Sequence, residues 1–167
     1  FSILLVHITL LATVVPCLAK QNDQVVEVAA NGGITRTVTI SNGNVLSEAY
    51  TIDKTGRRLI TKGSREFSFL ADGKLYSGKS NWPKTKVSTD GSTIITLTSE
   101  DDRLAVDLIY TSYPDLVLMR KEIRITNTGD KDIRIEGVNV EDFVYPYESS
   151  QTQINQTYGR FQTFGAY

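Results

Sequence analysis

Apolar residues after residue 24 recur mostly at every second position, and this alternation limits the fold more than any other feature of the chain. Val38 and Ile40 alternate with threonines, and Leu104, Val106 and Leu108 share one face of a later segment. Side chains of a β-strand alternate between two faces, whereas a helix repeats every ~3.6 residues. Because no long segment shows the helical period, the sequence predicts an all-β domain.

Short turns separate these segments. One is Asn42-Gly43, whose residue types tolerate the positive φ angles of a tight hairpin. Strands joined by such turns pair in the antiparallel sense. In residues 117–126 apolar residues alternate with charged residues, Arg120, Glu122 and Arg124. One side of this sheet is therefore expected to be exposed to solvent. The apolar side has to pack on another sheet, and we expect an antiparallel two-sheet β-sandwich.

Two local features refine this expectation. The alternation slips by one residue at Gly137, which predicts a β-bulge there. The stretch from Tyr76 to Lys86 is polar and rich in turn-forming residues, so we expect a loop.

Residues 1–19 contain no Asp, Glu, Lys or Arg and form an apolar run that stops at the polar stretch beginning with Lys20. This pattern predicts a signal peptide cleaved after Ala19 and a secreted or periplasmic protein. An uncleaved membrane anchor is the alternative, because the run is just long enough to span a bilayer.

Cleavage has a chemical consequence, because the single histidine, His7, and the single cysteine, Cys17, both lie in the leader. Residues 20–167 then contain no histidine base, no cysteine nucleophile, no His/Cys zinc ligand and no disulfide. The sequence therefore predicts no catalytic residue, no metal site and no cofactor in this chain.

The balance of charged residues limits the classes of partner that the chain can bind. The chain has 18 basic and 19 acidic residues and a net charge of −1. Nucleic acids and anionic membranes are bound by clustered basic residues. We expect no nucleic-acid partner, and no membrane contact once the signal peptide is removed.

We divide the chain into a leader (1–19), a sandwich domain (20–142) and an aromatic-rich tail (143–167). Exposed aromatic surface rarely stands alone on a monomer. We therefore predict that the tail forms an interface with a catalytic domain outside this sequence; a binding platform and disorder are the alternatives. The predicted interface aromatics are Tyr145, Tyr147, Tyr158, Phe161 and Phe164.

Trp82 and its neighbour Asn81 lie in the predicted polar loop. An exposed indole can stack on a sugar ring while an amide binds its hydroxyls, which would suit contact with a carbohydrate or with a neighbouring barrel domain. The alternative is that the indole caps one end of the sandwich core. Asn155 begins the one glycosylation acceptor, Asn155-Gln156-Thr157.

The acidic clusters are poor candidates for catalysis. Glycoside hydrolysis needs two cooperating carboxylates. Glu100, Asp101 and Asp102 occupy a turn, where acids are ordinary solvated residues, and Glu141 and Asp142 should face opposite ways along a strand. We expect Arg120 and Arg124 to form cross-strand ion pairs on the solvent-facing side of the sheet.

The segment from Tyr113 to Gly129 resembles part of the amino-terminal domain of family 36 α-galactosidases. A Tyr and a Pro there precede an Arg-bearing strand that ends in an Asn-x-Gly turn, as in Tyr113-Pro114 and Asn127-Thr128-Gly129. Asn31-Gly32-Gly33-Ile34-Thr35-Arg36, Asn44-Val45-Leu46 and Tyr158-Gly159-Arg160 fit the same domain more loosely.

The resemblance implies a galactose-mutarotase-like super-sandwich beside a carboxy-terminal (β/α)8 barrel. Both catalytic aspartates of those enzymes lie on the barrel, so no residue here takes either role. A complete domain of this kind is longer, and we expect this one to be incomplete. The expected function is a non-catalytic accessory domain of a secreted, α-galactosidase-like glycosidase whose carbohydrate substrate is met through the parent enzyme. The alternative is a free-standing carbohydrate-binding or adhesion module.

Overall fold

The computed structural model describes residues 23–30, 33–52, 54–113, 115–116 and 118–142. Within this range the chain forms strands joined by turns and contains no helix, as the alternating pattern predicted. The strands are β1 (Gln24–Ala30), β2 (Ile34–Ser41), β3 (Asn44–Ile52), β4 (Arg57–Ser64), β5 (Glu66–Ala71), β6 (Lys74–Ser77), β7 (Lys84–Asp90), β8 (Ser92–Thr98), β9 (Leu104–Tyr113), β10 (Leu118–Asn127) and β11 (Ile135–Asp142).

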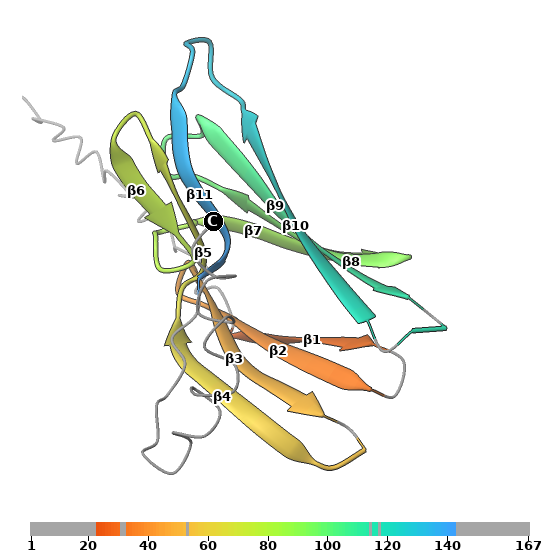
Figure 1. Ribbon diagram of the computed structural model, residues 1–167. Helices are drawn as coiled ribbons and strands as arrows, with labels where there is room; N and C mark the ends of the chain where they lie inside the picture. The colour runs from red at the N-terminus through yellow and green to blue at the C-terminus, as the bar shows by residue number, and fades with distance from the viewer. Residues whose placement is uncertain (1–22, 31–32, 53, 114, 117, 143–167) are drawn as a thin grey trace, which may run out of the picture.

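These strands form three sheets around a common core (Figure 1). The strand orders are β1-β2-β3-β4, β10-β9-β8-β7 and β11-β5-β6, and every pair is antiparallel. The first two sheets are simple meanders, because short turns allow each strand to pair with its predecessor. In the third sheet β11 pairs with β5, which lies far earlier in the chain.

Backbone hydrogen bonds connect the first and third sheets. The N–H of Val45 in β3 donates to the carbonyl of Gly78, at 2.6 Å, and the N–H of Gly78 donates to the carbonyl of Arg65, at 2.7 Å. A Cβ atom at Gly78 would lie 2.1 Å from the carbonyl oxygens of Arg65 and Val45, so only glycine fits at this junction. The predicted all-β antiparallel sandwich is confirmed.

The core follows directly from the alternation. Val38 and Ile40 of β2, Val45 of β3, and Val106 and Leu108 of β9 are all almost completely buried. Val38 and Ile40 have threonine or serine neighbours in sequence that point the other way, which is the arrangement of a sheet with one buried face.

One predicted turn and the predicted β-bulge appear with the expected geometry. Asn42 and Gly43 both have positive φ, 49° and 74°, and connect β2 to β3. Gly137 has a φ of 57°, and the β5–β11 register shifts between Glu136 and Asn139, so the predicted bulge is confirmed.

The predicted loop from Tyr76 to Lys86 is wrong at both ends. Strand β6 includes Tyr76, and β7 begins at Lys84. β7 is an edge strand whose Lys84 and Lys86 are exposed, so few apolar residues mark its face. A polar edge strand is difficult to distinguish from a loop by hydrophobic pattern alone.

Both ends of the chain lie outside the described residues, and with them the predicted signal peptide, the aromatic tail and Asn155. Among the residues that the structure describes, no helix is long and apolar enough to cross a bilayer.

Candidate functional site

Four charged side chains meet in the interior, where one from each of four strands converges. Arg36 comes from β2, Glu66 from the start of β5, Lys121 from β10 and Glu141 from β11, so all three sheets contribute. The Arg36 side chain is 2 % exposed, Glu66 0 % and Lys121 5 %, whereas Glu141 is 32 % exposed. We call these four residues the charge cluster.

Short ion pairs hold the cluster together. The Arg36 guanidinium donates from Nη2 to Oε1 of Glu66 at 2.6 Å and from Nη1 to Oε1 of Glu141 at 2.5 Å. The Lys121 Nζ lies 2.9 Å from Oε1 of Glu66 and 3.4 Å from Oε2 of Glu141. It also donates to the backbone carbonyl of Glu66 at 2.7 Å. Two cations therefore balance two carboxylates.

Two tyrosines enclose the Arg36 guanidinium. The ring of Tyr50 lies 4.8 Å from the guanidinium carbon and the ring of Tyr110 lies 5.3 Å from it, both within cation–π range. The Tyr110 hydroxyl also donates to the Glu66 carboxylate. Burial raises the pKa of both tyrosines, so these phenols stay protonated at neutral pH.

The cluster keeps its charges despite burial. Burial by itself would raise the pKa of the Glu66 carboxyl, but Lys121 and Arg36, with the Tyr110 hydroxyl, lower it to about 2. Burial likewise disfavours a charged Arg36, and its pairing with Glu66 and Glu141 raises its pKa above the ordinary value. Burial lowers the pKa of Lys121, although its pairs with Glu66 and Glu141 act in the opposite direction.

We expect such a cluster to fix how the four strands are placed relative to one another more than it adds to the free energy of unfolding. Desolvating charges costs several kcal/mol per ion, and pairing them roughly offsets that cost. Two buried polar atoms of the described cluster residues, Nε of Arg36 and Oε2 of Glu66, have no hydrogen-bond partner. The cluster is therefore neutral as a whole but incompletely satisfied.

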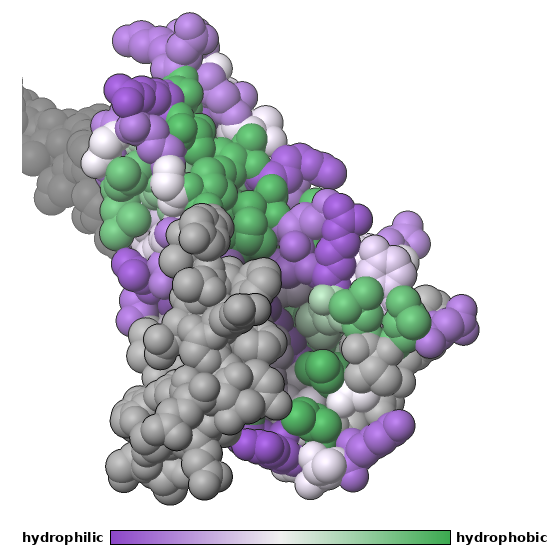
Figure 2. Space-filling model, viewed as in Figure 1, coloured by the Kyte–Doolittle hydropathy of each residue, from purple (hydrophilic) through white to green (hydrophobic). Residues whose placement is uncertain are grey.

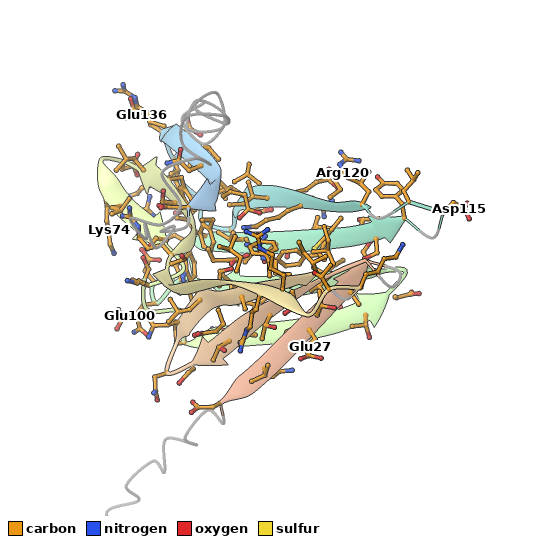
Figure 3. The ribbon with its side chains drawn as sticks, turned by 60° about the horizontal axis from the view of Figure 1, so that its bottom comes forward. Glu27, Lys74, Glu100, Asp115, Arg120 and Glu136 are labelled. Carbon is orange, nitrogen blue, oxygen red and sulfur yellow. The ribbon has the colours of Figure 1, made fainter. Side chains whose placement is uncertain are left out.

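A pocket of about 330 Å³ opens directly beside the cluster. Its polar wall is Arg36, Tyr50, Lys121 and Glu141, and its apolar wall is Ile34, Leu118, Met119 and Val140. The charged residues labelled in Figure 3, among them Glu27, Lys74 and Glu136, lie instead at the outside of the molecule. Charged groups that line a pocket without being free in solvent are unusual and mark this place as the candidate site.

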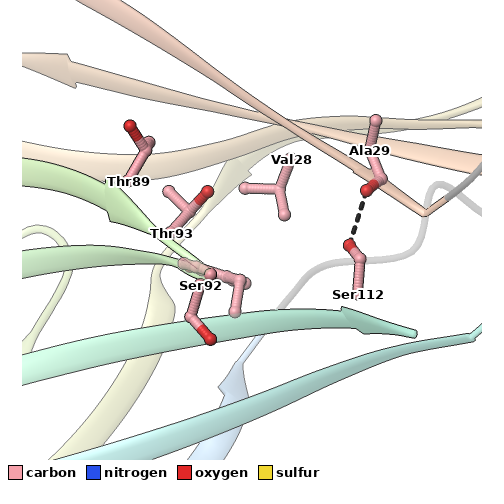
Figure 4. A pocket seen from close by; sticks show the side chains of 8 residues that line it. Val28, Ala29, Thr89, Ser92, Thr93 and Ser112 are labelled. Carbon is pink, nitrogen blue, oxygen red and sulfur yellow. Dashed lines mark hydrogen bonds between the residues drawn. The ribbon is translucent and has the colours of Figure 1, made fainter. Parts of the chain in front are cut away.

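A second pocket, of about 290 Å³, lies between β1 and the β7–β9 strands (Figure 4). Hydroxyl groups from Thr89, Ser92, Thr93 and Ser112 line it, and Ser112 donates to the carbonyl of Ala29. None of the described residues that line this pocket is charged, so these residues offer hydrogen bonds but no acid or base.

Trp82 is fully buried, as in the alternative in which the indole caps the sandwich core, and not exposed as contact with a sugar would require. Its indole lies 6.0 Å from the ring of Phe67 and 5.9 Å from that of Tyr76, and its Nε1 donates to the carbonyl of Ser77 at 2.8 Å. No face of the ring is open to a ligand. Asn81 is exposed and lines a pocket of about 450 Å³ together with residues of the Ser99–Asp101 turn.

The acidic candidates are held in local contacts. Asp101 accepts from the Ser99 hydroxyl at 2.6 Å, which lowers its pKa, and Asp102 pairs with Lys84. Glu141 belongs to the charge cluster, while Asp142 pairs with Arg65 at 3.1 Å. The two therefore do not form a common site.

Of the two arginines on the solvent-facing side of β10, only Arg124 forms the predicted cross-strand ion pair, whereas Arg120 pairs along its own strand. Arg120 contacts Glu122, two residues along the same strand, at 2.7 Å. Arg124 reaches Asp107 of β9 at 3.6 Å. In the described part of the chain no group of three or more acidic, histidine or cysteine residues could hold a metal ion.

Sequence reasoning missed the charge cluster, although the alternation contained the signal for two of its members. Arg36 is in phase with the buried Val38 and Ile40, and Lys121 is in phase with Met119 and Ile123. A charged residue on the apolar face of a strand needs a buried partner. Glu66 gave no such signal, because it starts its strand with an unusual positive φ of 66°.

The chain matches the model of the glycosyl hydrolase family 36 N-terminal domain over residues 35–163. The matched region contains the whole charge cluster. No curated protein and no solved structure matches the chain. Because the match covers most of the chain, this protein belongs to the glycosyl hydrolase family 36 N-terminal domains, which are accessory domains of glycoside hydrolases.

Proposed function

We propose that the chain is the non-catalytic amino-terminal domain of a secreted, α-galactosidase-like glycosidase, and that it supports a (β/α)8 barrel that follows it in the parent protein. The family match over residues 35–163 is the observation that carries this proposal. The apolar run of residues 1–19 supports export. The α-galactosidase specificity is supported by the likeness of the segment from Tyr113 to Gly129 to that family.

The state of the buried carboxylate supports placing the chemistry elsewhere. A glycosidase needs one carboxylic acid with a raised pKa, to protonate the leaving group, and a second carboxylate near it. Glu66 has a pKa lowered to about 2 and is completely buried, so it can neither donate a proton at neutral pH nor reach a substrate. Arg36 also blocks Glu141, which it engages with two hydrogen bonds.

A comparison of the parent protein with this domain tests the proposal. The parent gene should continue beyond Tyr167 into a barrel domain, and its product should release nitrophenol from a nitrophenyl α-galactoside, with the β-galactoside as the control substrate. Residues 20–167 alone should release none. Turnover by the isolated domain that is abolished by Glu141→Gln would overturn the proposal, as would a stop codon directly after Tyr167.

A free-standing carbohydrate-binding module is the second candidate, and the pocket beside Asn81 is the observation that favours it. Lys74, Ser80 and Asp101 offer hydrogen-bonding groups around it, and its volume of about 450 Å³ would admit a sugar ring. Because Trp82 is buried, calorimetry is a better probe than its fluorescence. Galacto-oligosaccharides should then bind the unaltered domain and the Ser88→Ala control, but not Asn81→Ala. A flat titration of the unaltered domain would remove this candidate.

A further inference from the structure

The facing margins of β10 and β11 leave the core uncovered. Ile135, Val138 and Val140 of β11 are 37 %, 38 % and 36 % exposed, and Leu118 at the start of β10 is 47 % exposed. Figure 2 shows apolar surface over β11 and toward β10. We call this region the apolar seam; it comprises Leu118, Met119, Ile123, Ile125, Ile135, Val138 and Val140.

The two strands run alongside each other without pairing. Lys121 of β10 contacts Glu141 of β11 at one end, and the turn after Asn127 connects the strands at the other end. In the described residues β10 is the last strand of one sheet and β11 the last of another, so each presents an unpaired backbone edge.

Two other edge strands of this protein, β7 and β1, carry charged residues that are exposed to solvent. The edge strand β7 carries exposed Lys84, Lys86 and Asp90, and β1 carries exposed Glu27. Charged side chains, above all lysine, are the usual protection of an edge that stays in solvent. β11 instead carries three exposed apolar side chains, Ile135, Val138 and Val140, whereas the exposed Val25 of β1 stands singly. Apolar surface gathered on one strand in this way indicates that something covers β11.

The pocket beside the charge cluster lies at the end of the seam. Leu118, Met119 and Val140 belong to both the seam and the pocket wall. The opposite wall contains Arg36, Tyr50, Lys121 and Glu141, and its two cations are paired with carboxylates. A space with one apolar and one polar wall suits an aromatic ring with a polar end, such as that of a tyrosine.

The chain itself supplies a matching segment. Residues 143–167 follow directly on Asp142, the last residue of β11, and contain Phe143, Tyr145, Tyr147, Tyr158, Phe161, Phe164 and Tyr167. Their only charged residues are Glu148 and Arg160, so little charge would have to be desolvated. At ~3.3 Å per residue the segment is long enough to turn and run back along the length of β11.

We propose that residues 143–167 bind along the apolar seam of their own sandwich and place an aromatic ring in the pocket beside Arg36 and Lys121. This binding does not depend on the sugar specificity proposed above. It differs from the sequence-based prediction, in which the same aromatics contact a neighbouring domain.

Hydrogen exchange measured by mass spectrometry on the 167-residue chain tests this binding. Amides in residues 143–167 should exchange at least ~10-fold more slowly than those of a free peptide of the same sequence. Val138→Asp together with Val140→Asp should abolish that protection. The matched control is Val25→Asp, because Val25 is 61 % exposed on a strand edge outside the seam. Exchange of 143–167 at the free-peptide rate in the unaltered chain would overturn the proposal.

A second variant avoids altering the sandwich. Tyr158→Ser, Phe161→Ser and Phe164→Ser combined should increase the binding of a dye that reports apolar surface, and should accelerate exchange in residues 135–142. Unchanged dye binding and exchange would count against the tail as the occupant.

The same measurements distinguish the other occupants. If a second copy covers the seam, protection of residues 135–142 will disappear on dilution and sedimentation will show a dimer. If a neighbouring domain covers it, residues 143–167 will be unprotected in this chain. Either result contradicts the proposal.

Discussion

Trp82 and Glu66 are both completely shielded from solvent, yet the surroundings of the two side chains differ in kind. Trp82 lies among aromatic rings, and its one polar atom has one partner, the Ser77 carbonyl. Glu66 depends on Arg36, Lys121 and Tyr110, which come from separate strands of two other sheets. The aromatic region is stabilised by contact area, which is tolerant of small shifts, whereas the charge cluster requires several elements in register at once.

Trp82→Ala should have the largest effect, a loss of about 3–5 kcal/mol in the free energy of unfolding, because a large aromatic side chain leaves a cavity. The loss should be the same at pH 4 and pH 7, since the indole packs on the rings of Phe67 and Tyr76 and its nitrogen bonds a neutral carbonyl. Urea denaturation followed by circular dichroism at both pH values measures it. A loss that depends strongly on pH would show that the two regions are coupled.

Glu66→Gln should cost about 3 kcal/mol, because it leaves Arg36 and Lys121 buried with Glu141 as their only carboxylate. Replacing all four members of the cluster with apolar residues of similar size should recover most of that stability. The combined variant has Arg36→Met, Glu66→Leu, Lys121→Met and Glu141→Leu. If it is less stable than Glu66→Gln alone, the ion pairs contribute net stability and the comparison drawn above is wrong.

Acid should weaken the charge cluster and not the aromatic region. The pKa of Glu66 falls from 4.5 to about 2 on folding, so its contribution is complete above pH 4.5 and is lost as the pH falls toward 2. The loss is on the order of 3 kcal/mol over that range. Unfolding free energies at pH 6, 4 and 3 should follow this course, and Glu66→Gln should flatten it. An equal acid dependence in the variant would mean that other carboxyls cause it.

Lys84→Ala should have the smallest effect, below about 1 kcal/mol. Lys84 pairs with Asp102 at 2.7 Å, about as closely as the members of the charge cluster, but the two side chains are 65 % and 59 % exposed. The effect should disappear in 1 M salt, because exposed ion pairs are screened. A loss as large as that of Glu66→Gln would show that burial is not what distinguishes the two ion pairs.

The strands show how far hydrophobic pattern alone can go. β2, β9 and β10 each alternate between a buried and a more polar face, and their sequences contain that alternation. β7 has a single apolar residue, Val87, and β6 is only four residues long, so their pattern was too weak to separate them from a loop. Trp82 remained open between core and surface, because an indole next to Asn81 and Pro83 fits either place.

The candidate site was less predictable than the fold. Each charged residue of the cluster lies on a different strand, and the pairings between β11 and β5 and between distant sheets are set by long-range packing. The phase of Arg36 and Lys121 could have indicated that both are buried, but not which carboxylates they meet.

The sequence by itself determined the all-β class, the antiparallel hairpins, the bulge at Gly137 and the family, because these depend on alternation, turn residues and local motifs that lie close together in the chain. Only the tertiary structure decided that Trp82 is buried, that Arg36 meets Glu66, Lys121 and Glu141, and that the margin of β11 is apolar and open. These features depend on which strands become neighbours across sheets, and that choice is made by packing of side chains far apart in sequence.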